Sequence, residues 1–180
     1  MDVISHWFWG ILLTRKKVSW KIAGPMGVLP DLLAFIPVTI ISMAQGIERV
    51  NVDDSTVTAD FHPLGWQLYQ WTHSFIFPFM IFLVALFVLR KREDFKRTAF
   101  IFVIPWIAHI IADIPSHTLQ FFPTPFLHPF SDWMFDGIRW SNPWVWFTNV
   151  GLLVLLWFIQ HKRGKDVQSI ELSADTAALA

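Results

Sequence analysis

The chain has 180 residues, of which 54% are hydrophobic and 16% charged, whereas about 25% of the residues of a soluble domain are charged. Its formal net charge is zero, so nothing in the charge favours nucleic acid as a partner. The chain contains no cysteine, which excludes disulfides, a thiolate nucleophile and cysteine-based zinc sites.

Apolar segments follow one another along the whole chain. Residues 3–13 are too few to cross a bilayer and are expected to form a half-helix or a tilted interfacial helix. Residues 22–45 are long enough, but three prolines and Asp31 interrupt them, so we expect irregular backbone around residues 24–30. Residues 72–89, 98–112 and 143–160 are uncharged over about the length of a bilayer span.

Tryptophans lie near the ends of these segments, as is typical of a membrane interface; they are Trp7, Trp9, Trp20, Trp66, Trp71, Trp140 and Trp144. The sequence therefore predicts an all-α integral membrane bundle with four to five membrane segments and a metal site at its outer face. Residues 1–165 form the membrane-embedded domain, and the polar residues 166–180 are expected to be a disordered tail.

Basic residues predict the orientation of the bundle. They cluster at 15–21, 90–97 and 161–165, whereas residues 48–60 are acidic. By the positive-inside rule the basic clusters face the cytoplasm, so the connections 46–71 and 115–142 lie on the outer side. We expect a protein of the bacterial cytoplasmic (inner) membrane.

The stretch His-Ile-Ile-Ala-Asp-Ile-Pro-Ser-His, residues 109–117, carries the strongest chemical signal. His109, Asp113 and His117 are four residues apart, so a helix would place them on one face. Ionisable groups at membrane depth cost about 2.5–3.5 kcal/mol each and need a compensating partner. A divalent cation is such a partner, because imidazole and carboxylate groups are its usual ligands.

Other histidines and acids are candidates for the same site. His73 lies at the outer start of an apolar segment, and His6 lies among aromatic residues that also suit an interfacial belt. Asp31 suits a helix N-cap as well as a ligand, and in a continuous helix it would lie about 13 Å from the cytoplasmic end, near mid-bilayer.

The connection 115–142 offers a further pair, His128 and Asp132. Pro129 suits a first helical residue, so we expect the pair to share one helix face, with Asp136 as an alternative to Asp132. A solvated loop helix explains them equally well. His62 and His161 are interpreted as surface residues outside the site.

Three elements of the sequence resemble those of the bacterial family of small membrane-bound metal-dependent hydrolases. They are Val28-Leu29-Pro30-Asp31, Trp71-Thr72-His73-Ser74 and His109-x-x-x-Asp113, and the likeness covers about residues 5–135. The resemblance implies a membrane-bound metallohydrolase and says little about the substrate.

The order of His and Asp residues is similar, more remotely, to the ligand order of the zinc-dependent phospholipase C and P1 nuclease superfamily. This likeness implies one ion held by Asp31, His73, His109 and Asp113, and a second held by His117, His128 and Asp132. It also implies that His6 and a bridging Asp113 contribute to a third ion. Those soluble enzymes use a processed N-terminal residue and a final Glu, whereas here Met1 precedes His6 closely and the final acid is Asp132. Two ions are therefore the safer expectation.

The leading hypothesis is a metal-dependent hydrolase that cleaves an ester, foremost a phosphate ester, of a lipid or lipid-linked substrate. Two or three zinc ions, or manganese, would activate a water, with Asp113 and Asp31 at the reacting centre. Arg139 and Trp133 are candidate contacts to a phosphate and an acyl chain. A divalent-cation transporter, a metal sensor and a structural membrane protein remain alternatives; transporter sites usually lie near the midplane, whereas most ligands here fall toward one face.

Overall fold

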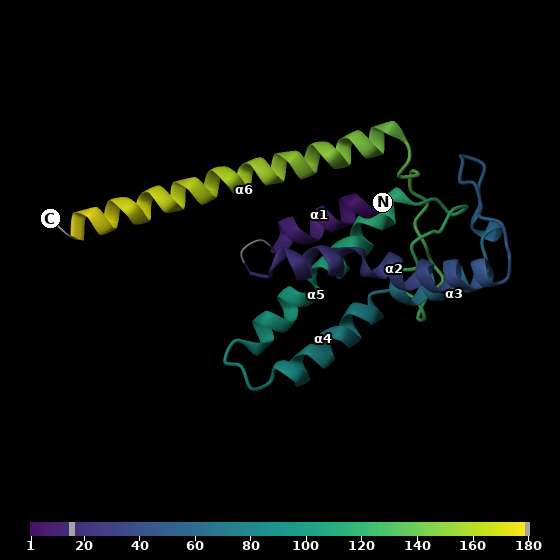
Figure 1. The fold of residues 1–180 in the computed structure, drawn as a ribbon, viewed down its shortest axis with the longest axis horizontal. Helices are drawn as coiled ribbons and strands as arrows, with labels where there is room; N and C mark the ends of the chain where they lie inside the picture. The colour runs from purple at the N-terminus through teal and green to yellow at the C-terminus, as the bar shows by residue number, and fades with distance from the viewer. Residues whose placement is uncertain (15–16, 179–180) are drawn as a thin grey trace.

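The regular elements of the part of the chain that the structure describes are helices (Figure 1). The structure, a computed structural model, describes residues 1–14 and 17–178, with side chains as far as Arg163. The elements are α1 (Val3–Thr14), α2 (Trp20–Ala44), the 3₁₀ turn η1 (Thr58–Asp60), α3 (Pro63–Thr72), α4 (Ile76–Leu89), α5 (Phe95–Asp113), the 3₁₀ turn η2 (Ile114–Ser116) and α6 (Pro143–Ala178). The predicted all-α class is confirmed.

Three helical stretches of the described chain are long and apolar enough to cross a membrane. They are Trp20–Ala44, Phe95–Ser116 and Pro143–Arg163. A fourth crossing exists if α3 and α4, which meet at an angle of 53°, count as one bent span. The predicted tail at residues 166–180 lies outside the residues whose side chains are described and stays a prediction.

The break expected within residues 24–30 is wrong, because α2 runs through Pro25, Pro30 and Pro37 as one helix. Each proline removes one backbone donor, but a helix enclosed by others tolerates this loss. α2 packs against α1, α3 and α5, which supports its backbone at the prolines. Asp31 therefore keeps a helical position in the middle of α2.

The turn between α3 and α4 positions His73, which is the C-cap residue of α3. Pro78 lies in the first turn of α4, where the missing N–H costs little because it would have no partner within the helix. The Ser74 hydroxyl accepts a hydrogen bond from Ile76 N at 3.2 Å and donates to the carbonyl of His128. The sequence predicts a connection over residues 46–71, but part of it forms the helix α3. α3 begins at Pro63, and the ring of His62 accepts a hydrogen bond from Leu64 N.

Glycines allow α1 and α2 to approach closely. A Cβ on Gly27 would lie 2.5 Å from the carbonyl oxygen of His6, and one on Gly10 would lie 2.5 Å from that of Ala23. Side chains at these positions would force the two helices apart. Backbone contact at Gly27 thus sets the place of His6 beside α2.

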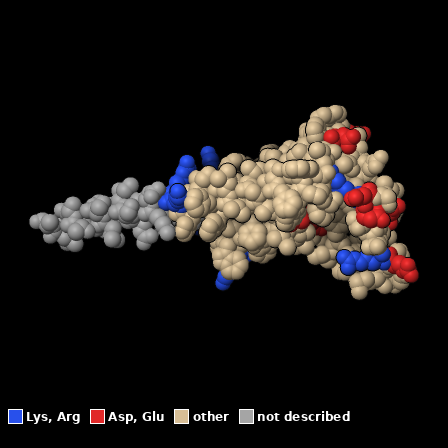
Figure 2. Space-filling model, turned by 90° about the horizontal axis from the view of Figure 1, so that it is seen from above, with Lys and Arg blue, Asp and Glu red and all other residues tan. Residues whose placement is uncertain are grey.

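The two ends of the bundle differ in charge (Figure 2). Lys and Arg gather at the end that carries the α1–α2 and α4–α5 connections and residues 162–163, which we name the basic end. Asp and Glu gather at the opposite end, which carries the connections 45–62 and 117–142 and which we name the acidic end. The helical stretches that are long and apolar enough to cross a membrane run between these ends (Figure 1).

The connection 117–142 is not helical in the described chain. Residues 126–130 form turns and residues 131–139 have no regular structure, so the expected helix beginning at Pro129 is wrong. The segment instead follows the end of the bundle, where Phe75 N donates to the carbonyl of Phe126 at 3.1 Å and Gly137 N donates to that of His117 at 2.8 Å. Such tertiary contacts override the local helix signal.

Candidate metal centre

Four side chains from three parts of the bundle meet in its interior. Asp31 comes from α2, His73 from the end of α3, and His109 and Asp113 from successive turns of α5. One ligand atom of each lies within 4.8 Å of the others. His73, His109 and Asp113 are buried, while the side chain of Asp31 is 14% exposed. We call these four residues the metal cluster, since together they could hold a metal ion.

Five of the six distances between the donor atoms of the metal cluster are close to the edge lengths of a small tetrahedron. Nε2 of His73 lies 3.0 Å from Nε2 of His109 and 3.3 Å from Oδ1 of Asp31. Oδ2 of Asp113 lies 3.1 Å from His109 Nε2 and 3.6 Å from His73 Nε2, and His109 Nε2 lies 3.7 Å from Asp31 Oδ1. Tetrahedral ligands about 2.0–2.2 Å from zinc are about 3.3–3.6 Å from one another. The observed distances scatter around that range.

Hydrogen bonds behind the two imidazoles aim their Nε2 atoms at the centre. Nδ1 of His109 lies 2.7 Å from the carbonyl oxygen of Gly27 and donates to it. Nδ1 of His73 lies 3.0 Å from the hydroxyl of Thr72, which itself donates to the carbonyl of Leu68 and so accepts from the ring. Each neutral ring then presents a bare Nε2 lone pair to the centre. Two lone pairs and two carboxylates converge, an arrangement that a cation stabilises.

A second set of nitrogens surrounds the other oxygen of Asp113. Oδ1 lies 3.1 Å from Nε2 of His6 and 3.5 Å from Nε2 of His117, and it pairs with the amino group of Met1. Both ring nitrogens of His6 are buried without a hydrogen-bond partner among the described residues. The His6 ring stacks on that of His109 with 3.5 Å between centroids. Asp113 thus faces a different set of donors with each oxygen.

The predicted helix face holds for two of its three residues. His109 and Asp113 lie one turn apart on α5, as their spacing predicts. His117 follows η2 in extended backbone, because Pro115 lacks the donor that a continuing helix needs. The chain nevertheless returns His117 to Asp113, and Asp31 and His6 reach the same carboxylate-rich interior from α2 and α1.

His128 and Asp132 lie outside the metal cluster. The His128 ring packs edge-on against Trp71, and its backbone oxygen accepts from Ser74. Asp132 is exposed, and so is the alternative Asp136, whose Oδ1 accepts from Leu119 N at 2.9 Å. In the described residues the donor set His117, His128 and Asp132 is therefore not assembled.

A chamber of about 660 Å³ leads from the metal cluster toward the acidic end. Asp31, His117 and Tyr69 line its inner part, and Arg49 and Arg139 line it as well. Four aspartates, Asp2, Asp31, Asp53 and Asp54, line the chamber together with these two arginines. Hydrogen bonds from Ser55 and Thr56 hold the pKa of Asp53 below its usual value, so this carboxylate stays charged. Without bound cations the chamber has an excess of negative charge.

The two residues expected to contact a substrate lie in different surroundings. Arg139 lines the chamber, but its guanidinium donates to the carbonyls of Asp54 and Thr56 and stacks 3.9 Å from the Phe121 ring. Trp133 is 60% exposed and packs edge-on against Phe126. Arg139 thus joins the connection 117–142 to residues 54–56.

Sequence reasoning missed the residues that support the metal cluster. Tyr69 stacks on the His73 ring with 3.6 Å between centroids, and Trp106 donates to the Thr72 carbonyl at 2.8 Å. Tyr69 lies four residues before His73, a helical spacing that signals contact between the two rings. Gly27 and Arg49 carry no comparable signal in the sequence.

Comparison of the chain with family models, with curated proteins and with solved structures gave no match. What the metal cluster can do therefore follows from its residues and their surroundings.

Proposed function

We propose that the protein is a membrane-embedded, metal-dependent hydrolase that cleaves an ester, foremost a phosphate ester, of a lipid or lipid-linked substrate. The observation that carries the proposal is the convergence of two imidazole nitrogens and two carboxylate oxygens within 4.8 Å of one another in the interior of the bundle. Burying His73, His109 and Asp113 almost fully is costly unless the charge is offset, and a bound cation would offset it together with the Met1 amino group that pairs with Asp113.

Asp31, His73, His109 and Asp113 would hold the ion, for which zinc suits the mixture of nitrogen and oxygen donors. A divalent ion in such surroundings acts as a Lewis acid and makes water nucleophilic near neutral pH. Asp31 borders the chamber while the other three residues are buried, so it is placed to accept a proton from a water that enters there. Each carboxylate oxygen of Asp113 faces a different set of histidines, so its negative charge would act on both sets.

A second ion is part of the proposal. Oδ1 of Asp113, Nε2 of His6 and Nε2 of His117 form the donor set that supports it, beside the Met1 amino group. Nε2 of buried His6 has no hydrogen-bond partner among the described residues, which is accounted for if this atom is a ligand. Asp113 would then bridge two ions, as the resemblance to the zinc phospholipase superfamily implies.

The proposed substrate is anionic because of the chamber that leads to the metal cluster. Bound cations would offset the four aspartates, and Arg49 and Arg139 would then give the chamber a net attraction for phosphate. Substrate binding, and not only turnover, should therefore require metal.

We propose an outer-face site in a bacterial inner membrane, with four crossings formed by α2, the α3–α4 pair, α5 and α6. The basic end would face the cytoplasm by the positive-inside rule, and the chamber opens toward the acidic end. Access from one end supports a hydrolase over a transporter, whose site is reached from both sides.

Hydrolysis of a panel of phospholipids, lysophospholipids and lipid-linked phosphates by the purified protein in detergent tests the proposal. We expect turnover that vanishes with chelator and returns with zinc or manganese. Asp113→Asn keeps the shape of the side chain but removes its charge, so it should lose turnover by several orders of magnitude while inserting normally. Unchanged turnover on the best substrate in a variant that has lost its metal would refute the hydrolase.

A further inference from the structure

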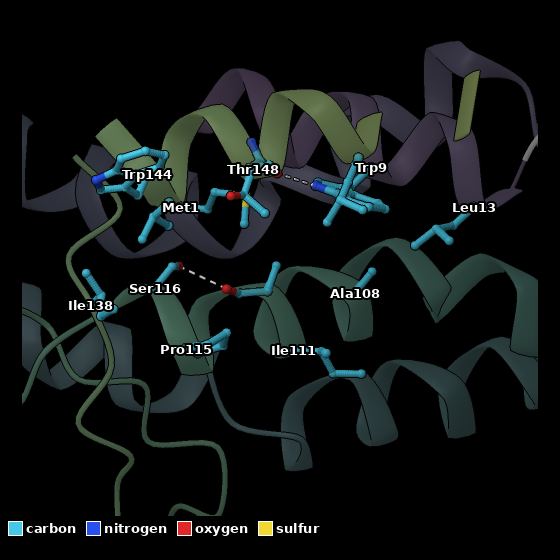
Figure 3. A pocket seen from close by; sticks show the side chains of 14 residues that line it. Met1, Trp9, Leu13, Ala108, Ile111, Pro115, Ser116, Ile138, Trp144 and Thr148 are labelled. Carbon is cyan, nitrogen blue, oxygen red and sulfur yellow. Dashed lines mark hydrogen bonds between the residues drawn. The ribbon is translucent and has the colours of Figure 1, made fainter. Parts of the chain in front are cut away.

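A second cavity, of about 670 Å³, lies between α1, α5 and α6 (Figure 3). Met1, Trp9 and Thr148 border it on one side and Ser116, Ile111 and Ala108 on the other (Figure 3). We call this cavity the lateral groove. Its volume lies within the usual range for small-molecule sites, about 300–1,000 Å³.

Most side chains in the walls of the lateral groove are apolar, and the polar groups of Trp9, Asn149 and Ser116 are already hydrogen-bonded. Trp9 Nε1 donates to Asn149 Oδ1 at 2.8 Å, and Asn149 Nδ2 donates to Ser5 Oγ at 2.6 Å. The Ser116 hydroxyl donates to the carbonyl of Ala112 at 2.9 Å. What remains for an occupant is hydrocarbon and aromatic surface, which favours an apolar guest.

The groove runs parallel to the helices that cross the membrane. Its lining extends along α6 from Trp144 to Leu152, a rise of eight residue steps or about 12 Å at 1.5 Å per residue. α5 and α6, two of its walls, are both long and apolar enough to span a bilayer, so the medium around the groove is lipid. A linear chain lying in it would point from the acidic end toward the middle of the membrane.

Met1 connects the lateral groove with the metal cluster. It lines both the groove and the chamber, and its amino group pairs with Asp113. Ser116, at the same end of the groove, follows Asp113 by one helical turn. A hydrocarbon chain in the groove would therefore have its polar end beside the metal cluster.

We infer that the lateral groove binds one acyl chain of a membrane phospholipid whose head group lies in the chamber. This inference rests on the proposed hydrolase function for the identity of the head group. It adds that the substrate is recognised by a single chain lying along α6, and that hydrolysis depends on the length of that chain.

Photolabelling of the full chain in detergent tests the inference without any need for turnover. The probe is a lysophospholipid with a diazirine in its acyl chain, used on the wild type. We expect label on residues 108–116 and 144–152 well above label on α4, whose exposed face touches only the detergent. Leu152→Trp and Thr148→Trp each fill the groove and should lower this label about tenfold, the effect of about 1.4 kcal/mol of lost binding.

Val84→Trp on the exposed face of α4 is the matched control, since it adds the same bulk outside the groove. It should leave the labelling unchanged. Equal labelling of α4 and the groove, or replacement of lipid label by cross-links between two copies of the chain, would overturn the inference. Groove labelling with no hydrolysis of any lipid would refute the proposed function and leave the groove assignment intact. Hydrolysis of a lipid with label only outside the groove would refute the groove assignment and leave the proposed function intact.

Discussion

Asp113 is the residue on which the two donor sets depend. Its Oδ2 faces His73 and His109, and its Oδ1 faces His6, His117 and the Met1 amino group. A carboxylate that serves two ions cannot be replaced by a neutral group without loss at both. His117 approaches only one of these oxygens.

Asp113→Ala should therefore remove more metal than His117→Ala. We expect the first variant to lose both ions and the second to keep the ion of the metal cluster. Elemental analysis of the two purified variants beside the wild type measures this. Equal loss in both variants would contradict a bridging role for Asp113.

Thr72 contacts the metal cluster through the ring of His73. Thr72→Val removes the oxygen that accepts from His73 Nδ1 but keeps the volume of the side chain. Removing a residue that orients a metal-binding imidazole typically lowers metal affinity about 10–100-fold. We expect a loss of affinity of that size, measured by competition with a chelating dye. Thr14→Val is the control, because Thr14 also donates to a carbonyl four residues earlier but contacts no histidine. An equal loss of metal affinity in Thr72→Val and Thr14→Val would show that the hydrogen bond to His73 is not the cause.

Only part of the site could be predicted from local spacing. His109 and Asp113 share a helix face by their separation alone. The approach of His6 and His117 to Asp113 depends on how α1 packs against α5 and on how the chain turns at Pro115, and neither is encoded in a short motif. The predicted helical position of His128 is wrong for the same reason, since His128 lies in a turn and its ring packs against Trp71.

Among the elements, α1 and α2 make the contact that decides where His6 lies. Gly27→Ala would put a methyl group 2.5 Å from the His6 carbonyl, too close for any real contact. We expect a loss of about 1–3 kcal/mol in the free energy of unfolding, as for other overpacked sites. Thermal or denaturant unfolding in detergent measures the change, and metal content should fall with it because Gly27 also accepts from His109.

Gly151→Ala on α6 is the matched control, since a Cβ there meets nothing within 4 Å. Alanine favours a helix over glycine by up to about 1 kcal/mol, so this variant should be as stable as the wild type or slightly more stable. Equal destabilisation by both substitutions would show that close approach at Gly27 is not the cause.

The apolar segments of the sequence predict where helices lie more accurately than the residues between these segments do. Segments 98–112 and 143–160 lie within α5 and α6 because uninterrupted apolar runs leave a helix as the one way to satisfy the backbone in lipid. The continuity of α2 through three prolines could not be predicted, since it depends on the helices around it. α3 was missed because its polar residues resemble those of a loop.

For the molecule as a whole, the difference in charge between the two ends leads to a prediction of its orientation. Because the chain has no cysteine, single cysteines can be introduced without removing any. Glu48→Cys at the acidic end should react with an impermeant thiol reagent in intact cells, and Glu93→Cys at the basic end only after permeabilisation. Labelling of residue 93 in intact cells would reverse the orientation and place the chamber on the cytoplasmic side.

Asp31, His73, His109 and Asp113 should together hold a divalent metal ion. Elemental analysis of the purified wild type, of His73→Ala and of the control His62→Ala tests it most directly, since His62 lies outside the metal cluster. We predict at least one zinc or manganese ion per chain in the wild type and in His62→Ala, and its loss in His73→Ala. A wild-type protein that binds no divalent ion after incubation with either metal would contradict the account.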